Sequence, residues 1–108
     1  KEIDQFEEVK ERFKPFRTKI IKGPIPDTLP QADMEKVAFL SIDMNSERPE
    51  VAALEYFWPK LVSGAVIVLD DYGYPGCINQ KLAHDKFAAS KGVMVLSMPT
   101  CQGLIIKP

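Results

Sequence analysis

VAFLSI (residues 37–42) and AVIVL (residues 65–69) are two apolar runs, and acid follows each of them directly: Asp43 after the first, Asp70 and Asp71 after the second. Apolar runs with almost no polar alternation are typical of strands that a parallel sheet covers on both faces. We therefore expect two buried strands, each ending at a carboxylate.

The segment between these runs predicts a helix over Pro49–Leu61. Proline suits the first turn of a helix, where its missing N–H is not needed. The apolar side chains expected on one face of this helix are Val51, Leu54, Tyr56, Phe57 and Trp58. A strand, a crossover helix and a second strand indicate an α/β fold with a doubly wound, Rossmann-like parallel sheet, in which ligands lie beyond the carboxyl ends of the strands.

The flanking segments predict the remaining elements. Apolar residues spaced by three or four indicate an amphipathic helix over Ile3–Phe16, and β-branched residues indicate a short strand over Thr18–Lys22. Three prolines favour a loop over Pro24–Pro30. A helix over Asn79–Ser90 is followed by Val93–Ser97 and Leu104–Lys107, which we expect to close the chain as an antiparallel β-hairpin.

The three aspartates fall at the ends of adjacent predicted strands. Because parallel strands lie about 4.8 Å apart, the carboxylates of Asp43, Asp70 and Asp71 should converge at one edge of the sheet. A hard divalent cation such as Mg²⁺ would offset their mutual repulsion. Alternatively, these aspartates cap helices and turns. A phosphoacceptor receiver domain also uses three acids, but its acidic pair follows an earlier strand than its lone aspartate, the reverse of the order here.

Composition narrows the class of protein. With 108 residues and a net charge of −1, the chain is expected to be a single domain with no broad field to attract nucleic acid. No apolar run approaches the roughly 20 residues that span a bilayer, so we expect no membrane partner. Cys77 and Cys101 lack metal-binding spacing. We expect both to be reduced thiols and the protein to be cytoplasmic.

The strings VAFLSIDMN, LVSGAVIVLDDYGYPGC and CQGLIIKP resemble the macrocin O-methyltransferase family, and KIIKGPIPDTLP is similar to the third-strand segment of that family. The likeness covers nearly the whole chain. It implies a class I methyltransferase that uses S-adenosylmethionine and Mg²⁺ to methylate a hydroxyl group of a sugar or a similar small diol. It also implies that Asp43, Asp70 and Asp71 bind the metal and that Asp43 is the general base.

By the same resemblance, the cofactor-binding residues are Gly23, Ile25, Pro26, Asp27 and Met44. Two positions depart from related enzymes: Asn45 stands where the family often has a second aspartate, and Ser46 stands where catechol-type enzymes have lysine. No G-x-G loop opens a helix in this sequence, so the main cofactor loop is missing. The resemblance thus places residues 1–108 in a single partial methyltransferase domain that begins at the third strand.

Two other function classes stay open at this point. One is a catalytically inactive fragment that self-associates through exposed strands as a homo-oligomer. The other is an interaction module that kept the sheet and lost the chemistry. Among the smaller signals, His84 is expected on the surface or half-buried within a helix, and Tyr72 is expected to pack onto the neighbouring helix rather than to line a substrate mouth.

Overall fold

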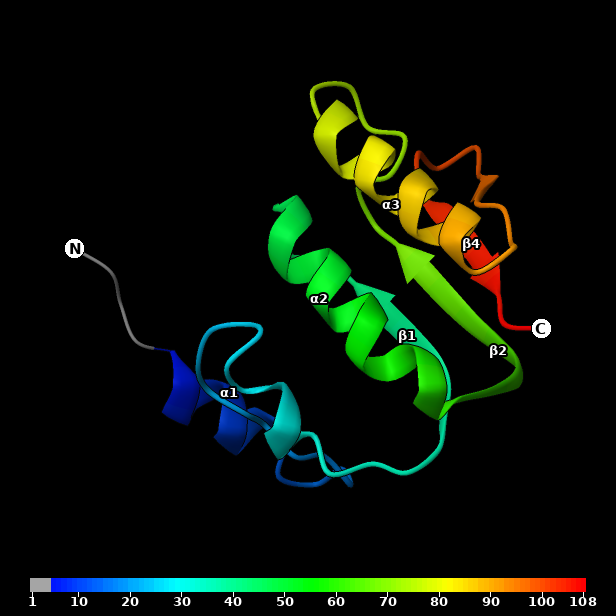
Figure 1. Ribbon diagram of the computed structural model, residues 1–108. Helices are drawn as coiled ribbons and strands as arrows, with labels where there is room; N and C mark the ends of the chain where they lie inside the picture. Colours follow the sequence, from blue (N-terminus) through cyan, green and yellow to red (C-terminus); the bar gives the residue numbers. More distant parts are fainter. Residues whose placement is uncertain (1–4) are drawn as a thin grey trace.

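The computed structural model describes residues 5–108 and forms one mixed sheet with helices beside it (Figure 1). The helices are α1 (Phe6–Arg12), α2 (Glu47–Phe57) and α3 (Ile78–Ser90), and the strands are β1 (Val37–Ile42), β2 (Leu61–Leu69), β3 (Leu96–Ser97) and β4 (Gly103–Ile106). Short 3₁₀ turns lie at Leu29–Gln31 and Trp58–Lys60. The predicted α/β class is confirmed.

The four strands lie in the order β1-β2-β4-β3. Only β1 and β2 are parallel, joined through α2, whereas β4 runs antiparallel to both β2 and β3. The prediction of a parallel sheet therefore holds for the two strands that carry the aspartates. Their parallel pairing brings Ile42 opposite Leu69, so the residues after both strands lie at the same edge of the sheet.

Both long helices cover the same face of the sheet (Figure 1). On that face Ile67, Leu69 and Ile105 are fully buried, together with Leu54 of α2. On the opposite face the register aligns Phe39, Val66 and Ile106 in one row, and Phe39 is 61% and Ile106 45% exposed. The expectation that β1 is covered on both faces is therefore wrong for the described residues, because α2 and α3 pack on one side only.

Helix α2 begins two residues before the predicted Pro49 and ends at Phe57. The chain continues as a 3₁₀ turn because Pro59 has no N–H for an α-helical hydrogen bond and its ring clashes with the preceding turn. Trp58 in this turn meets Phe87 of α3 edge to face, with ring centroids 5.4 Å apart. This aromatic contact joins the ends of the two helices that cover the sheet.

The N-terminal segment differs most from the prediction. Helix α1 is shorter than expected, and Ile3 lies outside the described residues. The strand predicted over Thr18–Lys22 is not formed. A strand needs a neighbour to pair its backbone groups, and among the described residues no strand adjoins this segment. Instead, the Lys19 side chain donates a 2.6 Å hydrogen bond to the carbonyl of Gln31.

The loop predicted over Pro24–Pro30 is present and contains the start of the 3₁₀ turn at Leu29. Gly23, which precedes it, has a φ of +139°, and a Cβ at this position would overlap the methyl group of Thr28. Thr28 in turn bonds back to the carbonyl of Pro24 through both its N–H and its hydroxyl. Glycine at position 23 thus allows the loop to fold closely on itself. Among residues 5–108, no helix is both long and apolar enough to span a bilayer.

Candidate metal centre

The carboxylates of Asp43, Asp70 and Asp71 come together at the carboxyl end of β1 and β2. One oxygen from each lies within 4.8 Å of one oxygen from each of the others. The backbone fixes this approach, since the N–H of Asp70 donates a 3.0 Å hydrogen bond to the carbonyl of Ile42, the residue just before Asp43. The convergence predicted from the parallel strands is therefore present.

The electrostatics of this cluster are those of an anionic site. The pKa of Asp43 is raised by desolvation and by the negative charges of Asp70 and Asp71. Because Asp43 is exposed to solvent, the neighbouring charges are the more important cause. Asp71 Oδ2 is buried and has no hydrogen-bond partner. A buried carboxylate oxygen without a donor is costly, and a cation would satisfy it.

A glutamine from the turn between β3 and β4 also reaches the site. Gln102 Nε2 donates a 3.0 Å hydrogen bond to Asp70 Oδ1, and the Gln102 Oε1 accepts one from the hydroxyl of Thr100. The backbone of the same turn is tied to the acidic loop, since the N–H of Gly73 donates to the carbonyl of Cys101 at 2.8 Å. Thus the turn that precedes β4 holds the loop that follows β2.

Glu50, in the first turn of α2, supports the loop after β1. Glu50 Oε2 accepts a 3.0 Å hydrogen bond from the N–H of Met44, and Glu50 Oε1 lies 2.9 Å from His84 Nε2. The ring of His84 is not turned for a well-aligned hydrogen bond, and its Nδ1 is buried without a partner. Gln80 Nε2 is 3.5 Å from both oxygens of Glu50. Burial opposes the ionised form of Glu50, but the contacts with His84 and Met44 prevail and lower its pKa.

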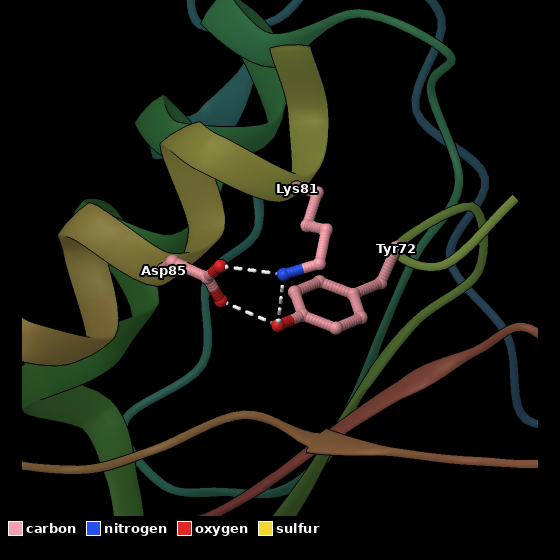
Figure 2. A network of polar contacts seen from close by, with 3 residues as sticks. All are labelled: Tyr72, Lys81 and Asp85. Atoms are coloured by element: carbon pink, nitrogen blue, oxygen red, sulfur yellow. Dashed lines mark hydrogen bonds and ion pairs between the residues drawn. The ribbon is translucent and has the colours of Figure 1, made fainter. Parts of the chain in front are cut away.

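The loop after β2 is anchored to α3 by Tyr72. Figure 2 shows the Tyr72 hydroxyl pointing at Asp85 and Lys81: it donates to Asp85 Oδ1 at 2.5 Å and accepts from Lys81 Nζ at 3.3 Å. Lys81 and Asp85 also pair with each other at 2.9 Å. The Tyr72 ring is buried and stacks on His84, with centroids 6.2 Å apart. Tyr72 therefore packs onto the neighbouring helix, as predicted.

The family model described as macrocin-O-methyltransferase (TylF) matches residues 3–96. The chain belongs to this family. Mycinamicin III 3''-O-methyltransferase of Micromonospora griseorubida is 31% identical over 61 residues, which are 56% of this chain and 24% of that protein.

A solved structure with the same fold is that of CalS11, a TDP-rhamnose 3'-O-methyltransferase of calicheamicin biosynthesis. It superimposes with a TM-score of 0.67 at 20% identity, over 80% of this chain and 39% of the other. This macrocin-O-methyltransferase family member thus spans less than half the length of the relatives that it matches.

The residues that the resemblance assigned to the cofactor lie on two segments of this family member. Ile25 and Met44 are half-buried and pack against the hydrophobic core, whereas Gly23, Pro26 and Asp27 are exposed. Met44 adjoins Asp43 and is fixed by Glu50. Their contact with a cofactor stays a prediction.

Three supporting residues escaped the sequence prediction: Glu50, Gln102 and His84. The expectation of a surface or half-buried His84 is wrong, because the side chain is fully buried between α2 and the Tyr72 ring. The helical spacing of the sequence could have indicated two of these residues, Glu50 and His84. Glu50 precedes the buried Ala53 and Leu54 by three and four positions, and His84 precedes the buried Phe87 and Ala88 by the same spacing. Polar residues on the apolar stripe of a helix are therefore candidates for buried partners.

Proposed function

We propose that this chain is the metal-bearing part of an O-methyltransferase that transfers a methyl group from S-adenosylmethionine to a hydroxyl of a sugar or another small diol-like substrate. Family membership supports the methyl-transfer chemistry. Both relatives are named as O-methyltransferases, and one of them, CalS11, is named for TDP-rhamnose, which supports a sugar as the class of acceptor. Residues 1–108 would form one partial methyltransferase domain, in which the segment similar to the family's third strand, Thr18–Lys22, does not form a strand.

The observation that carries the proposal is the buried, unpartnered Oδ2 of Asp71 beside the two other carboxylates. Oxygen ligands of this kind suit Mg²⁺, which binds through one or a few carboxylates and retains waters. Asp43, Asp70 and Asp71 would hold the ion. Asn45 follows at a φ of 55°, in the left-handed region that asparagine tolerates, and it offers an amide oxygen near the same edge.

The three carboxylates would have different roles in the reaction. A bound divalent ion would supply Lewis acidity that lowers the pKa of an acceptor hydroxyl. Asp43 is the most exposed of the three, which leaves its carboxylate accessible to an acceptor hydroxyl as a general base. Asp70 and Asp71 stay with the ion, because Gln102 and the buried environment hold them in place. Gly23, Ile25, Pro26, Asp27 and Met44 would line the cofactor side.

Calorimetric titration of the chain with Mg²⁺ and then with S-adenosylmethionine tests the proposal. Binding of both supports a methyltransferase site that includes the cofactor contacts. Binding of Mg²⁺ alone supports the metal centre and means that the cofactor residues within this chain do not bind S-adenosylmethionine by themselves. Asp71→Asn is the matched variant, and it should lose Mg²⁺ binding while keeping the fold. Binding of neither ligand overturns the proposal.

A second candidate is an inactive, self-associating fragment, and the uncovered sheet face favours it. Phe39, Leu96 and Ile106 are 61%, 53% and 45% exposed on this face, and β1 has no neighbour on its outer edge among the described strands. Exposed apolar faces and strand edges promote pairing with another copy. Sedimentation at increasing concentration should then show a homo-oligomer that Phe39→Lys dissociates. A monomer at all concentrations would exclude this candidate.

A further inference from the structure

The carboxylate of Glu50 is the most deeply buried acidic group among the described residues. Its residue is 1% exposed, and its partners are the N–H of Met44, the imidazole of His84 and the amide of Gln80. Taking an ionised carboxylate out of water is unfavourable unless hydrogen bonds and charges replace the lost solvation. The loop after β1 and helix α3 therefore both contact this one side chain.

Stability alone gives a weak reason for such a group. A buried ionic pair is often matched or exceeded in stability by apolar residues of similar volume. Leu54, one turn further along the same face of α2, is an apolar side chain that is fully buried in the core. The direction of the contacts is more informative, because Glu50 Oε2 reaches out of the core to the loop after β1 and binds the backbone of Met44.

We propose that Glu50 is a positioning residue for the acidic site, with His84 and Gln80 holding it in place. It fixes the backbone of Met44, and thereby sets Asp43 against Asp70 and Asp71. This inference rests on the proposed metal centre. It extends that centre to residues that touch neither the ion nor the substrate.

The geometry explains why the loop needs such a support. Asp43 lies beyond the last paired residue of β1, so the ladder between β1 and β2 ends at Ile42 and Leu69. The next residues turn sharply, since Asn45 has a φ of 55° and α2 begins at Glu47. The N-cap residue of α2, Ser46, makes no side-chain capping bond. The bond from Met44 to Glu50 thus ties the backbone of this turn to the core, beside the packing of the Met44 side chain.

His84 and the N–H of Met44 contact different oxygens of the Glu50 carboxylate. With one oxygen 2.9 Å from His84 Nε2, the other is directed to the N–H of Met44. His84 also stacks on Tyr72, which directly follows Asp71. A single buried histidine therefore contacts the supports of both strand-end loops, and displacement of α3 would move both.

The test uses two substitutions of Glu50 in the full chain. Glu50→Met fills a similar volume without an acceptor, and it should weaken Mg²⁺ binding, measured by calorimetry, by about tenfold or more, as is usual for residues that support metal ligands. Glu50→Gln keeps an acceptor oxygen for Met44, and it should retain an affinity within about threefold of the original chain. Hydrogen exchange of the Met44 amide, followed by NMR without metal, should accelerate in Glu50→Met and much less in Glu50→Gln.

Ile105→Val is the control for a general loss of stability, because Ile105 is fully buried in β4, where it pairs with Ile67 of β2 and not with a residue of either acidic loop. It should lower the unfolding temperature and leave the Mg²⁺ affinity unchanged. Equal affinities in Glu50→Met and the original chain would overturn the positioning role. So would an equal loss in Ile105→Val, or no rescue by Glu50→Gln. If the original chain does not bind Mg²⁺, the proposed metal centre fails first, and this inference fails with it.

Discussion

Gln102 and Asp70 are joined by a 3.0 Å hydrogen bond in which the side-chain amide of Gln102 donates to Oδ1 of Asp70. The bond links the turn before β4 to a candidate metal ligand 32 residues earlier in the chain. It leaves the other oxygen of Asp70 available to a cation. A carboxylate held in this way is oriented before the ion arrives, which favours binding.

We therefore expect Gln102→Met to weaken Mg²⁺ binding by about tenfold, because Asp70 loses its orienting donor. Calorimetry measures the affinity directly. Thr100→Ser retains the hydroxyl that donates to Gln102 Oε1, and it should bind Mg²⁺ as the original chain does. An unchanged affinity in Gln102→Met would mean that Asp70 is oriented by the backbone alone.

Asp43→Asn should have opposite effects on metal binding and on the stability of the metal-free chain. It removes one ligand, so Mg²⁺ affinity should fall. It also removes a carboxyl group whose pKa is raised by desolvation and by the charges of Asp70 and Asp71. A carboxyl with a raised pKa in the folded state opposes folding when it is ionised, and this effect disappears below its unfolded pKa. In EDTA at pH 7 the variant should thus melt at a higher temperature than the original chain, and at pH 3 the difference should vanish. A lower melting temperature at pH 7 would contradict the repulsion.

The strand-end aspartates were predictable because the signals around them are local. The apolar run over residues 37–42 matches β1 residue for residue, and Asp43 follows it as predicted. The parallel register then places Asp70 beside Ile42 without further information. Pro59, in contrast, ended α2 earlier than the hydrophobic pattern indicated, since that pattern does not register the missing N–H.

The supports of the site depend on contacts between distant residues, which single-sequence patterns do not carry. Glu50 meets Gln80 across 30 positions of the chain, and Gln102 meets Asp70 across 32. The prediction of a strand over Thr18–Lys22 was wrong for a related reason. β-branched residues favour a strand, but a strand forms only beside a partner strand. The uncovered face of β1 could not be predicted either, because an apolar run gives the same pattern whichever segment covers it.

Tyr72→Phe should destabilise the fold by about 1 kcal/mol, the usual contribution of a hydrogen bond in a partly exposed setting. The substitution keeps the buried ring and its stacking on His84, and removes only the hydroxyl that donates to Asp85. Urea denaturation measures the change. Tyr74→Phe is the matched control, because Tyr74 is 58% exposed, and its free energy of unfolding should stay within about 0.5 kcal/mol of the original. Equal effects of the two substitutions would exclude a stabilising role for the Tyr72 hydroxyl.

The same network predicts how stability changes in acid. Burial favours the neutral form of Asp85, but its bonds with Tyr72 and Lys81 favour the ionised form more, and the net result is a lowered pKa. A carboxyl with a lowered pKa stabilises the fold above its unfolded pKa, and this contribution is lost as the pH falls through the folded pKa. Part of the acid destabilisation of the chain should therefore arise from Asp85, below about pH 4.

Asp85→Asn should accordingly be less stable than the original chain at pH 7, and the difference should narrow as the pH falls below about 4. Urea denaturation at several pH values gives the two curves. Glu11→Gln breaks only an exposed ion pair with Lys14, and its curve should run parallel to that of the original chain, because such pairs contribute little. The difference in the free energy of unfolding between Asp85→Asn and the original chain could instead stay constant down to pH 2. Ionisation of Asp85 would then contribute nothing to stability, and packing alone would anchor the Tyr72 loop to α3.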